Sequence, residues 1–352
     1  MPRWPPVVRA AGGGPRRGGL RGERAVMRAL VTGATGFVGA NVARRLLEDG
    51  HQVHLLVRPG HDPWRIEAIA GDVVVHVAAL EDEDGVGRAV RDARPDWVFN
   101  LAAAGAYSWQ VDLRAMIGTN FVGTVNLLEA ALRQGFEAFV HTGSSSEYGV
   151  KAAAPTEDDA VEPNSHYAVT KAAATLYCAH TGRSREAPVR VLRLYSAYGP
   201  WEEPRRLIPA LACRGLDGRL PPLAGPAIAR DYVYVDDVVD AHLAAASVAA
   251  QRPGAVYNVA TGRQTSLREV VEVARQELGV DAEPHWGSMP DRSWDCETWV
   301  GDPARIAAAL GWRAGTELAE GFRRTVAWLR DTPGMREAYE RRRAAAAQGK
   351  ST

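Results

Sequence analysis

Short apolar runs rich in β-branched residues alternate along the chain with longer segments in which apolar residues recur every three or four positions. This alternation predicts strands separated by helices, and such an order predicts parallel strands. The expected strands are residues 28–32, 52–57, 73–77, 97–102, 138–143 and 188–196. The expected helices among them lie near residues 37–49, 112–134 and 166–183. The predicted fold class is therefore α/β, with a Rossmann-type doubly wound parallel sheet.

The regular alternation stops at Gly199-Pro200, and residues 201–228 are rich in proline and glycine. We expect residues 27–200 to form the Rossmann domain, with residues 229–260 returning to it. Residues 201–228 and 261–330 are expected to form a smaller C-terminal lobe. The elements expected in this half are strands at 256–260 and 282–286 and helices at 266–278, 303–310 and 316–330. Residues 331–352 are predicted to be a fraying helix that ends in a polar tail.

Residues 1–26 are crowded with glycine, proline and arginine and show no periodicity, which predicts a disordered tail. Met27 stands directly before the first expected strand. We therefore expect the functional chain to begin at Met27, and mass spectrometry of the natively expressed protein would test this.

The 352 residues carry 42 basic and 42 acidic side chains, so the formal net charge is zero. A neutral chain lacks the overall attraction of proteins that bind nucleic acids or membrane surfaces, and we expect neither partner. The three cysteines form no CxxC pair and the nine histidines lack metal-binding spacing, which predicts no disulfide framework and no metal site. No run approaches the roughly 18 apolar residues of a membrane-spanning helix. We expect a cytoplasmic protein that acts on small molecules.

Three glycines, Gly33, Gly36 and Gly39, follow the first expected strand at intervals of three and open the first helix. Gly33 suits a tight turn, Gly36 lets the backbone approach a pyrophosphate, and Gly39 allows close contact between helix and sheet. The N-terminus of the helix favours the anion. This pattern predicts a dinucleotide site, the alternative being an ordinary strand-to-helix turn.

The second expected strand is followed by Arg58, and no carboxylate stands at its end. A carboxylate there would accept a hydrogen bond from the ribose 2′-hydroxyl of NAD, whereas an arginine suits the 2′-phosphate of NADP. NADP(H) is therefore the favoured cofactor, and NAD remains possible. The alternative is that Arg58 is a solvated surface arginine.

Tyr167 and Lys171 are four residues apart in an expected helix, so their side chains share one face. A neighbouring ammonium favours the phenolate and would lower the pKa of the Tyr167 phenol towards a useful range. Lys171 is conspicuous because the chain has only two other lysines, Lys151 and Lys350. The serines that begin at Ser144 follow an expected strand, where a hydroxyl would hold a substrate oxygen, although a helix cap is the alternative.

These segments together resemble the extended short-chain dehydrogenase/reductase family of nucleotide-sugar epimerases, dehydratases and reductases. The resemblance covers nearly all of residues 27–330, and its motifs are GATGFVG (33–39), NLAA (100–103), GTNFVGTVNLLEAAL (118–132), GSSSEYG (143–149), YAVTK (167–171), LRLYSAYGP (192–200) and RDYVYVDDVVDAH (230–242). It implies that Ser144 and Tyr167 are catalytic with Lys171 as partner, and that Asn120 supports the lysine through water.

The same resemblance implies which residues contact the cofactor and the substrate. The implied cofactor contacts are Gly33, Thr35, Gly36, Phe37, Val38, Gly39, Arg58, Leu80 near the adenine, Leu101, and Ala102, Ala103, Tyr195 and Ala197 near the nicotinamide half, besides Tyr167 and Lys171. The candidate substrate contacts of the smaller, substrate-binding lobe and its surroundings are Ser145, Ser196, Arg206, Arg230 and Arg292. Arg230 is the best candidate for the diphosphate, and the alternative for each arginine is a surface or structural role.

Departures from the family pattern narrow the expected reaction. The family's 4,6-dehydratases carry Asp-Glu directly after the catalytic hydroxyl residue, where this chain has Ser145 and Ser146. Dehydration is therefore disfavoured, although Glu147 lies close by. Ser196 replaces an asparagine that often contacts the sugar nucleotide, a form that resembles the 4-ketoreductases of CDP-linked dideoxysugars, such as abequose and paratose synthases.

The leading expectation is an NADP(H)-dependent reductase of a nucleotide-linked 4-keto-6-deoxysugar. The first alternative is a nucleotide-sugar epimerase that holds NAD(P)⁺ tightly, and the second is a non-catalytic dinucleotide sensor. The resemblance also implies a homodimer that forms through a four-helix bundle of the helices at 112–134 and 166–183.

Overall fold

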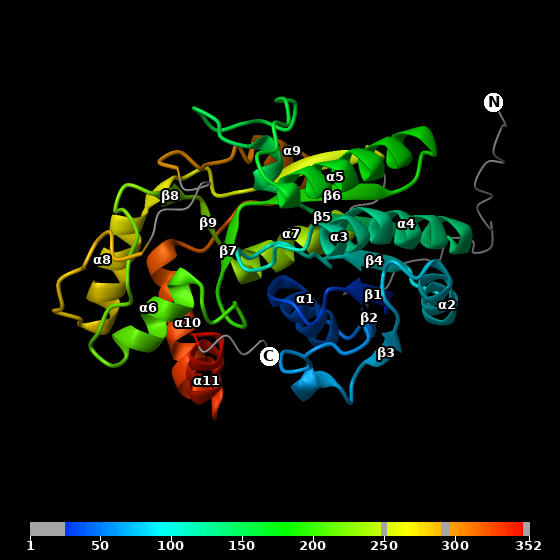
Figure 1. Ribbon diagram of the computed structural model, residues 1–352. Helices are drawn as coiled ribbons and strands as arrows, with labels where there is room; N and C mark the ends of the chain where they lie inside the picture. Colours follow the sequence, from blue (N-terminus) through cyan, green and yellow to red (C-terminus); the bar gives the residue numbers. More distant parts are fainter. Residues whose placement is uncertain (1–24, 248–251, 290–295, 348–352) are drawn as a thin grey trace, which may run out of the picture.

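The computed structural model describes residues 25–247, 252–289 and 296–347. Its centre is a seven-stranded sheet in the order β10-β6-β5-β4-β1-β2-β3 (Figure 1). The strands are β1 (Arg28–Thr32), β2 (Gln52–Val57), β3 (Val74–Val77), β4 (Trp97–Asn100), β5 (Ala138–Ser144), β6 (Val189–Leu194) and β10 (Ala255–Val259). All six pairings between them are parallel, and the doubly wound α/β prediction is confirmed.

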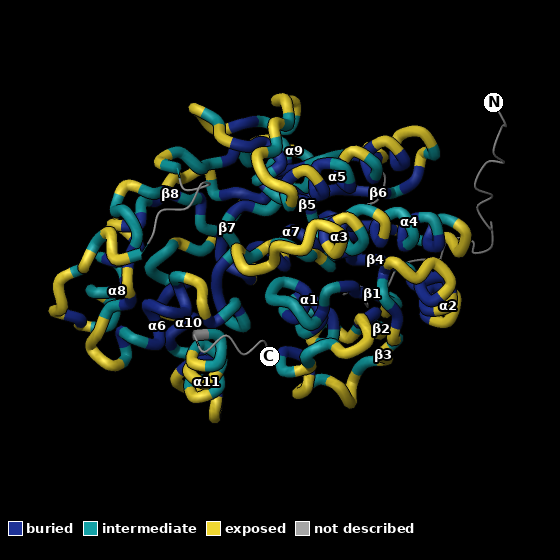
Figure 2. The backbone as a smooth tube through the Cα atoms, in the orientation of Figure 1, coloured by how far each residue is buried: buried dark blue, intermediate teal, exposed yellow. Residues whose placement is uncertain are grey.

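Helices cover both faces of this sheet, which explains why its inner strands are continuous apolar runs. One face packs against α1 (Phe37–Glu48), α7 (Val235–Ser247) and α9 (Ala304–Leu310). The other packs against α2 (Glu83–Ala93), α4 (Gly123–Gln134) and α5 (His166–Ser184). Figure 2 shows the buried strands between these two layers. The carboxyl ends of the strands consequently meet at one edge, where ligands of such folds bind.

The helix expected at 112–134 is composite. It consists of α3 (Leu113–Met116), a π-helical stretch η2 (Ile117–Val122) and α4. Leu113–Gln134 as a whole is long and apolar enough to cross a membrane by length and composition, and half of its most apolar window is buried inside the protein. Polar residues such as Asn120 and Glu129 interrupt this stretch, so it is not a continuous apolar run, and a partly buried core helix of this fold has the same mean composition.

The C-terminal lobe surrounds a second core, and its helices gather at the left in Figure 1. The helices are α6 (Leu207–Gly215), α8 (Leu267–Leu278), α10 (Leu318–Asp331) and α11 (Met335–Ala347). Two small sheets accompany them, β8 (Ala229–Arg230) with β11 (Thr265–Ser266) and β7 (Ser196–Tyr198) with β9 (Tyr232–Tyr234). Two short 3₁₀ helices complete the described elements, η1 (Glu67–Ile69) and η3 (Ser145–Tyr148).

The structure differs from the expectations for residues 282–286 and for the C-terminal tail. Residues 282–286 form no strand. The region expected to be a fraying C-terminal tail instead forms α11, because Tyr339 is buried in the lobe core and its hydroxyl donates to the backbone oxygen of Glu202 at 2.8 Å. The predicted N-terminal tail lies outside the described residues, except for residues 25 and 26.

Candidate active site

The glycine-rich turn connects β1 to α1 with almost no free space around it. Gly33 has a positive φ of 71°, and a Cβ atom on it would lie 2.6 Å from the backbone nitrogen of Ala102. A Cβ atom on Gly39 would lie 2.3 Å from the oxygen of Gly33. Gly36 is the N-cap of α1, where no side chain caps the helix. The first amide groups of α1 thus remain available to an anion, which fits a dinucleotide pyrophosphate.

The remaining predicted cofactor contacts lie along the same edge of the sheet. Phe37 and Val38 begin α1, and the carbonyl of Thr35 accepts a hydrogen bond from Arg65 Nη1 at 3.2 Å. Arg58 is exposed directly after β2, in the position that the 2′-phosphate prediction requires. Leu80 is buried in the connection between β3 and α2.

Leu101, Ala102 and Ala103 follow the end of β4, and the Ala102 amide donates to Thr32 Oγ1 at 3.2 Å. Tyr195 and Ala197 lie at the end of β6 and in β7. The fold therefore brings the predicted nicotinamide-half contacts to the ends of β4 and β6, the two strands that flank β5.

The catalytic turn is formed by Ser144, at the end of β5, and the short helix η3 that it caps. The Ser144 amide donates to Glu147 Oε1 at 2.8 Å, and the Ser146 amide donates to Ser144 Oγ at 3.2 Å. The hydroxyls of Ser144 and Ser146 are 2.7 Å apart. Ser144 thus caps the short helix η3, as the alternative interpretation of the serine run predicted. This cap also fixes the position of the Ser144 hydroxyl.

A buried ion pair between Arg193 and Glu147 stabilises this turn. Arg193 Nε donates to Glu147 Oε2 at 2.8 Å, and both side chains are almost completely buried. Arg193 also donates to the Tyr148 hydroxyl, which donates in turn to Asn258 Oδ1, each at 2.8 Å. Burial raises the pKa of Glu147, while Arg193 and the Thr175 hydroxyl oppose the rise. Our sequence reasoning missed this network, although an arginine inside the apolar strand VRVLRL was a signal for it.

Tyr167 lies in the first turn of α5, where Ser165 Oγ caps the helix by accepting from the Ala168 amide at 3.2 Å. Burial raises the pKa of the Tyr167 phenol to about 12, and a hydrogen bond with the Ser144 side chain opposes this rise. Ser144 and Tyr167 are separated in the sequence, and the structure brings their hydroxyls together.

Lys171 is only 2% exposed, and its Nζ donates to the carbonyl of Thr142 at 2.5 Å. Burial lowers the pKa of Lys171 to about 8. The expectation that this ammonium lowers the pKa of Tyr167 is not met in this arrangement: the pKa of Tyr167 is raised, because burial dominates it and the Lys171 ammonium is directed at β5.

Asn120 contacts the residue next to Lys171 rather than the lysine itself. Its side chain donates to Thr170 Oγ1 at 2.9 Å and joins both backbone groups of Ala104 through hydrogen bonds of 2.8 Å. Asn120 therefore ties the loop after β4 to α5.

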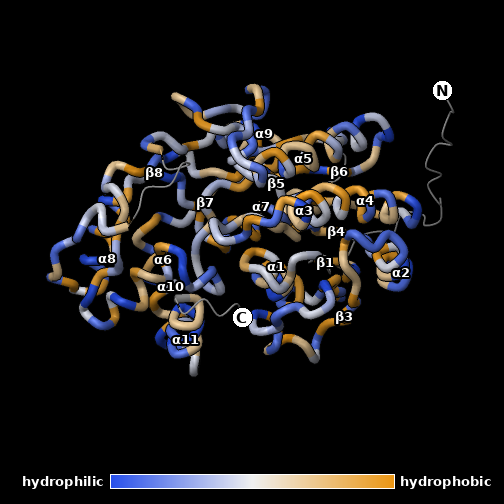
Figure 3. The backbone as a smooth tube through the Cα atoms, viewed as in Figure 1, coloured by the Kyte–Doolittle hydropathy of each residue, from blue (hydrophilic) through white to orange (hydrophobic). Residues whose placement is uncertain are grey.

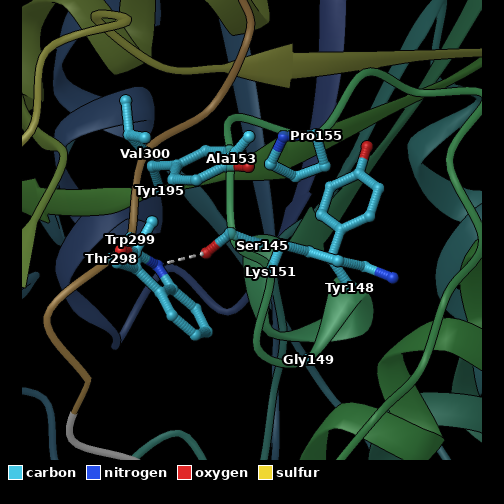
Figure 4. A pocket seen from close by; sticks show the side chains of 10 residues that line it. All are labelled: Ser145, Tyr148, Gly149, Lys151, Ala153, Pro155, Tyr195, Thr298, Trp299 and Val300. Carbon is cyan, nitrogen blue, oxygen red and sulfur yellow. Dashed lines mark hydrogen bonds between the residues drawn. The ribbon is translucent and has the colours of Figure 1, made fainter.

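A small hollow lies between the catalytic turn and the C-terminal lobe (Figure 4). The Trp299 Nε1 group donates to Ser145 Oγ at 3.1 Å across it. Tyr195 also faces the hollow, and its buried hydroxyl has no hydrogen-bond partner among the described residues. Trp299 was absent from our sequence candidates because it stands 154 residues from Ser145 and in no recognisable motif.

The predicted substrate arginines take different positions. Arg230 donates to the Ala229 carbonyl at 2.7 Å and lies 5.5 Å from the ring centroid of Trp299, which places it beside the hollow. Arg206 is exposed, and its Nε lies 3.5 Å from Glu202 Oε1. The backbone of Ser196 donates to the carbonyl of Asp231 at 2.9 Å. Arg292 lies outside the described residues.

Residues 29–260 match the model of the NAD dependent epimerase/dehydratase family. The chain belongs to this family. Its curated relatives include a UDP-glucose 4-epimerase of Mycolicibacterium smegmatis, 34% identical over 322 residues, which span 87% of this chain and 99% of that protein. A dTDP-glucose 4,6-dehydratase of Streptomyces griseus is 33% identical over 311 residues, which span 85% of this chain and 93% of that protein.

Solved structures of the epimerase/dehydratase family agree with the fold. The UDP-glucose 4-epimerase of Thermus thermophilus, in complex with NAD, is 31% identical and has a TM-score of 0.76 over 87% of this chain and 100% of that chain. The UDP-glucose 4-epimerase of Thermotoga maritima, solved with UDP-glucose, is 28% identical and has a TM-score of 0.78 over 87% of this chain and 99% of that chain. The family resemblance predicted from the motifs is confirmed.

Proposed function

We propose that this chain is a nucleotide-sugar epimerase that uses NAD and inverts one carbon of the sugar. The observation that carries this proposal is the composition of the catalytic turn. Ser144 and Tyr167 are present, while the two positions that hold Asp-Glu in the family's dehydratases are Ser145 and Ser146. The site thus contains the acid–base group for hydride transfer and lacks the additional pair that eliminates water.

The nearby carboxylate does not replace that pair. Glu147 is completely buried, and it accepts hydrogen bonds from Arg193, Thr175 and the Ser144 amide. A buried carboxylate with these partners stabilises the conformation of the catalytic turn. An acid–base catalyst, in contrast, must reach the reacting atoms. Glu147 is therefore assigned a positioning role.

The chain's own residues would perform the following steps. The Ser144 hydroxyl hydrogen bonds to the sugar oxygen. Tyr167 accepts the proton of that oxygen in its phenolate form, which a pKa of about 12 makes a minor species at neutral pH, and later returns it. The Lys171 ammonium donates to the Thr142 carbonyl in this structure, and it would leave that contact to orient the cofactor ribose. The glycine-rich turn and the N-terminus of α1 bind the pyrophosphate. When bound, NAD supplies the hydride acceptor and donor.

One observation favours a second candidate, the NADPH-dependent reductase of a 4-keto sugar. Arg58 follows β2 directly and is exposed, so its guanidinium can contact a 2′-phosphate. No carboxylate stands at the end of β2. The same Ser144 and Tyr167 would serve the reduction.

Two measurements distinguish the candidates. The protein is first purified without added nucleotide and denatured, and the released dinucleotide is identified by chromatography. UDP-, dTDP-, CDP- and GDP-linked hexoses are then incubated with the protein. An epimerase releases bound NAD⁺ and interconverts two hexoses without net consumption of cofactor. Nucleotide-linked 4-keto-6-deoxyhexoses are supplied with NADPH in a parallel assay. Oxidation of one NADPH per 4-keto sugar would favour the reductase, and a 4-keto-6-deoxy product from a plain hexose would contradict both.

We predict that Arg58→Ala weakens the binding of NADP⁺ by about tenfold and leaves the affinity for NAD⁺ within about twofold, since a charge-assisted contact contributes about 1.5–3 kcal/mol. Titration of both dinucleotides by calorimetry measures this. Arg88→Ala, at an exposed position of α2, is the matched control. Equal weakening of both dinucleotides would show that Arg58 does not read the 2′-phosphate.

We further propose that the chain forms a homodimer through α3, η2, α4 and α5. Large apolar side chains are exposed on α3, η2 and α5, and Figure 3 shows hydrophobic stretches along α3 and α4. The exposed residues are Leu113, Ile117, Val122, Val169 and Leu176. An apolar surface of this kind marks an interaction site.

We predict that Leu176→Glu converts the dimer to a monomer, because Leu176 is 56% exposed on α5 and a charge at that position would be buried without a partner in the interface. Light scattering coupled to size exclusion measures the mass. Val77→Glu, on the exposed edge strand β3, is the control and should leave the dimer intact. A monomeric native chain would refute the proposed interface.

A further inference from the structure

Residues 105–111, called the strap below, connect the loop after β4 to helix α3. Figure 1 shows this segment extending from β4 and α3 towards β7, and Figure 2 shows that much of it is exposed. Both ends are fixed. Asn120 binds the two backbone groups of Ala104 at 2.8 Å, and Asp112 caps the first turn of α3.

Between these ends the strap forms a small unit of its own. Gln110 Oε1 accepts from the amides of Gly105 at 3.0 Å and Tyr107 at 3.3 Å. The rings of Tyr107 and Trp109 stack with their centroids 4.9 Å apart and an interplanar angle of 6°. Within the described part of the chain, the hydrogen bonds of the strap all remain inside it. The strap can therefore move without breaking hydrogen bonds to the rest of the protein.

The Trp109 ring of the strap contacts the loop that precedes α6 in the C-terminal lobe. The Arg205 guanidinium lies 3.2 Å from the ring centroid of Trp109. Glu203 holds Arg205 at 3.0 Å and also lies 3.7 Å from Arg65. Arg65 is buried and donates to the carbonyl of Thr35 in the glycine-rich turn. Arg205 is thus held by a network that extends to the cofactor turn. Between its ends, the strap contacts this network through Trp109 and through the buried Tyr107 phenol, which lies near Arg65, Glu203 and Arg206.

The closed strap lies beside the catalytic tyrosine. Tyr107 lies near enough to Tyr167 to raise the pKa of the Tyr167 phenol. Arg206, which follows Arg205 in the chain, lies near enough to lower that pKa. The contact between Trp109 and Arg205 therefore joins the loop after β4 to the loop that precedes α6, close to Tyr167.

We propose that the strap closes the sugar side of the crevice over the bound nucleotide sugar, with Trp109 on Arg205 as its latch. This inference rests on the proposed function for the identity of the ligand. The substrate enters when the ring leaves the guanidinium, and closure places Tyr107 against the sugar and excludes water during hydride transfer. A ring–guanidinium contact suits a latch because it opens without leaving a buried hydrogen-bonding group unpaired.

The test uses the full chain saturated with NAD⁺, with UDP, dTDP, CDP and GDP as probes. The variants are Trp109→Ala, Arg205→Ala, their combination, and Trp109→Phe. We expect Trp109→Ala and Arg205→Ala each to raise the dissociation rate of the bound probe about tenfold, and the combination to add little to either. Trp109→Phe retains a ring and should remain within about threefold of the native rate. Hydrogen exchange in residues 105–111 should accelerate in Trp109→Ala without any probe.

The outcomes separate the latch from the proposed function. If a probe binds and its dissociation rate is the same in Trp109→Ala, or if the two single effects add fully, the latch is refuted and the proposed function stands. If none of the four probes binds to the native chain, the proposed function is refuted, and with it the role of the strap as a cover for a nucleotide sugar. Unchanged hydrogen exchange in Trp109→Ala would refute the latch in either case.

Discussion

Tyr167→Phe is expected to lower kcat by about 10²–10⁴-fold, because it removes the one group placed to exchange a proton with the sugar oxygen. The ring itself remains, so the fold and the binding of NAD⁺ should be unchanged. Turnover of the nucleotide sugar found for the native chain and calorimetric titration of NAD⁺ measure the two quantities. Retained binding with lost turnover would also exclude the non-catalytic sensor as the function of the native chain.

Tyr177→Phe is the matched control for this experiment. Tyr177 lies on the same helix α5, and its hydroxyl donates to Glu129 Oε1 at 2.7 Å, away from Ser144. Its loss should leave kcat within about twofold, since a single partly exposed hydrogen bond contributes only about 1 kcal/mol to stability. If Tyr167→Phe turns over the substrate at the native rate, the proposed mechanism is refuted, whatever the result for Tyr177→Phe.

Arg193→Met is expected to have the largest effect on stability, a loss of about 3–5 kcal/mol in the free energy of unfolding. Arg193 and Glu147 are 4% and 0% exposed, so the substitution leaves a buried carboxylate without its cation. The Tyr148 hydroxyl loses a donor as well. Chemical unfolding followed by circular dichroism measures the change.

The comparison variants show whether burial causes this effect. Arg324→Met removes an exposed ion pair with Glu320 and should cost less than about 1 kcal/mol. Combining Arg193→Met with Glu147→Leu should recover part of the stability, because the unpaired charge is then removed. A loss below about 1 kcal/mol in Arg193→Met would mean that the pair does not hold the catalytic turn.

Several parts of the candidate site follow from local sequence. The glycine spacing at residues 33–39 predicts the turn, and the structure has no room for a Cβ atom on Gly33 or Gly39. The interval between Tyr167 and Lys171 predicts one helix face, and both residues lie on α5. These features depend on the period of a strand or helix, which neighbouring residues determine.

Other parts could not be predicted because they are contacts between distant segments. Trp299 reaches Ser145 across 154 residues, and α11 is held by Tyr339, which contacts Glu202 across 137 residues. The sequence around Tyr339 is rich in arginine and alanine and resembles a solvated tail. Only the lobe core that receives the tyrosine shows that the segment folds against the protein.

The strand–helix alternation, the family, the glycine turn and the identity of the catalytic candidates are predictable from the chain alone, since each depends on short segments of consecutive residues. The contacts of those residues depend on the three-dimensional fold. The fold paired Glu147 with Arg193, directed the Lys171 ammonium at Thr142, and placed Trp109 of the strap on Arg205. The physical reason is that burial and partner choice depend on which distant segments the sheet order brings together, and those two properties determine how each charged group acts.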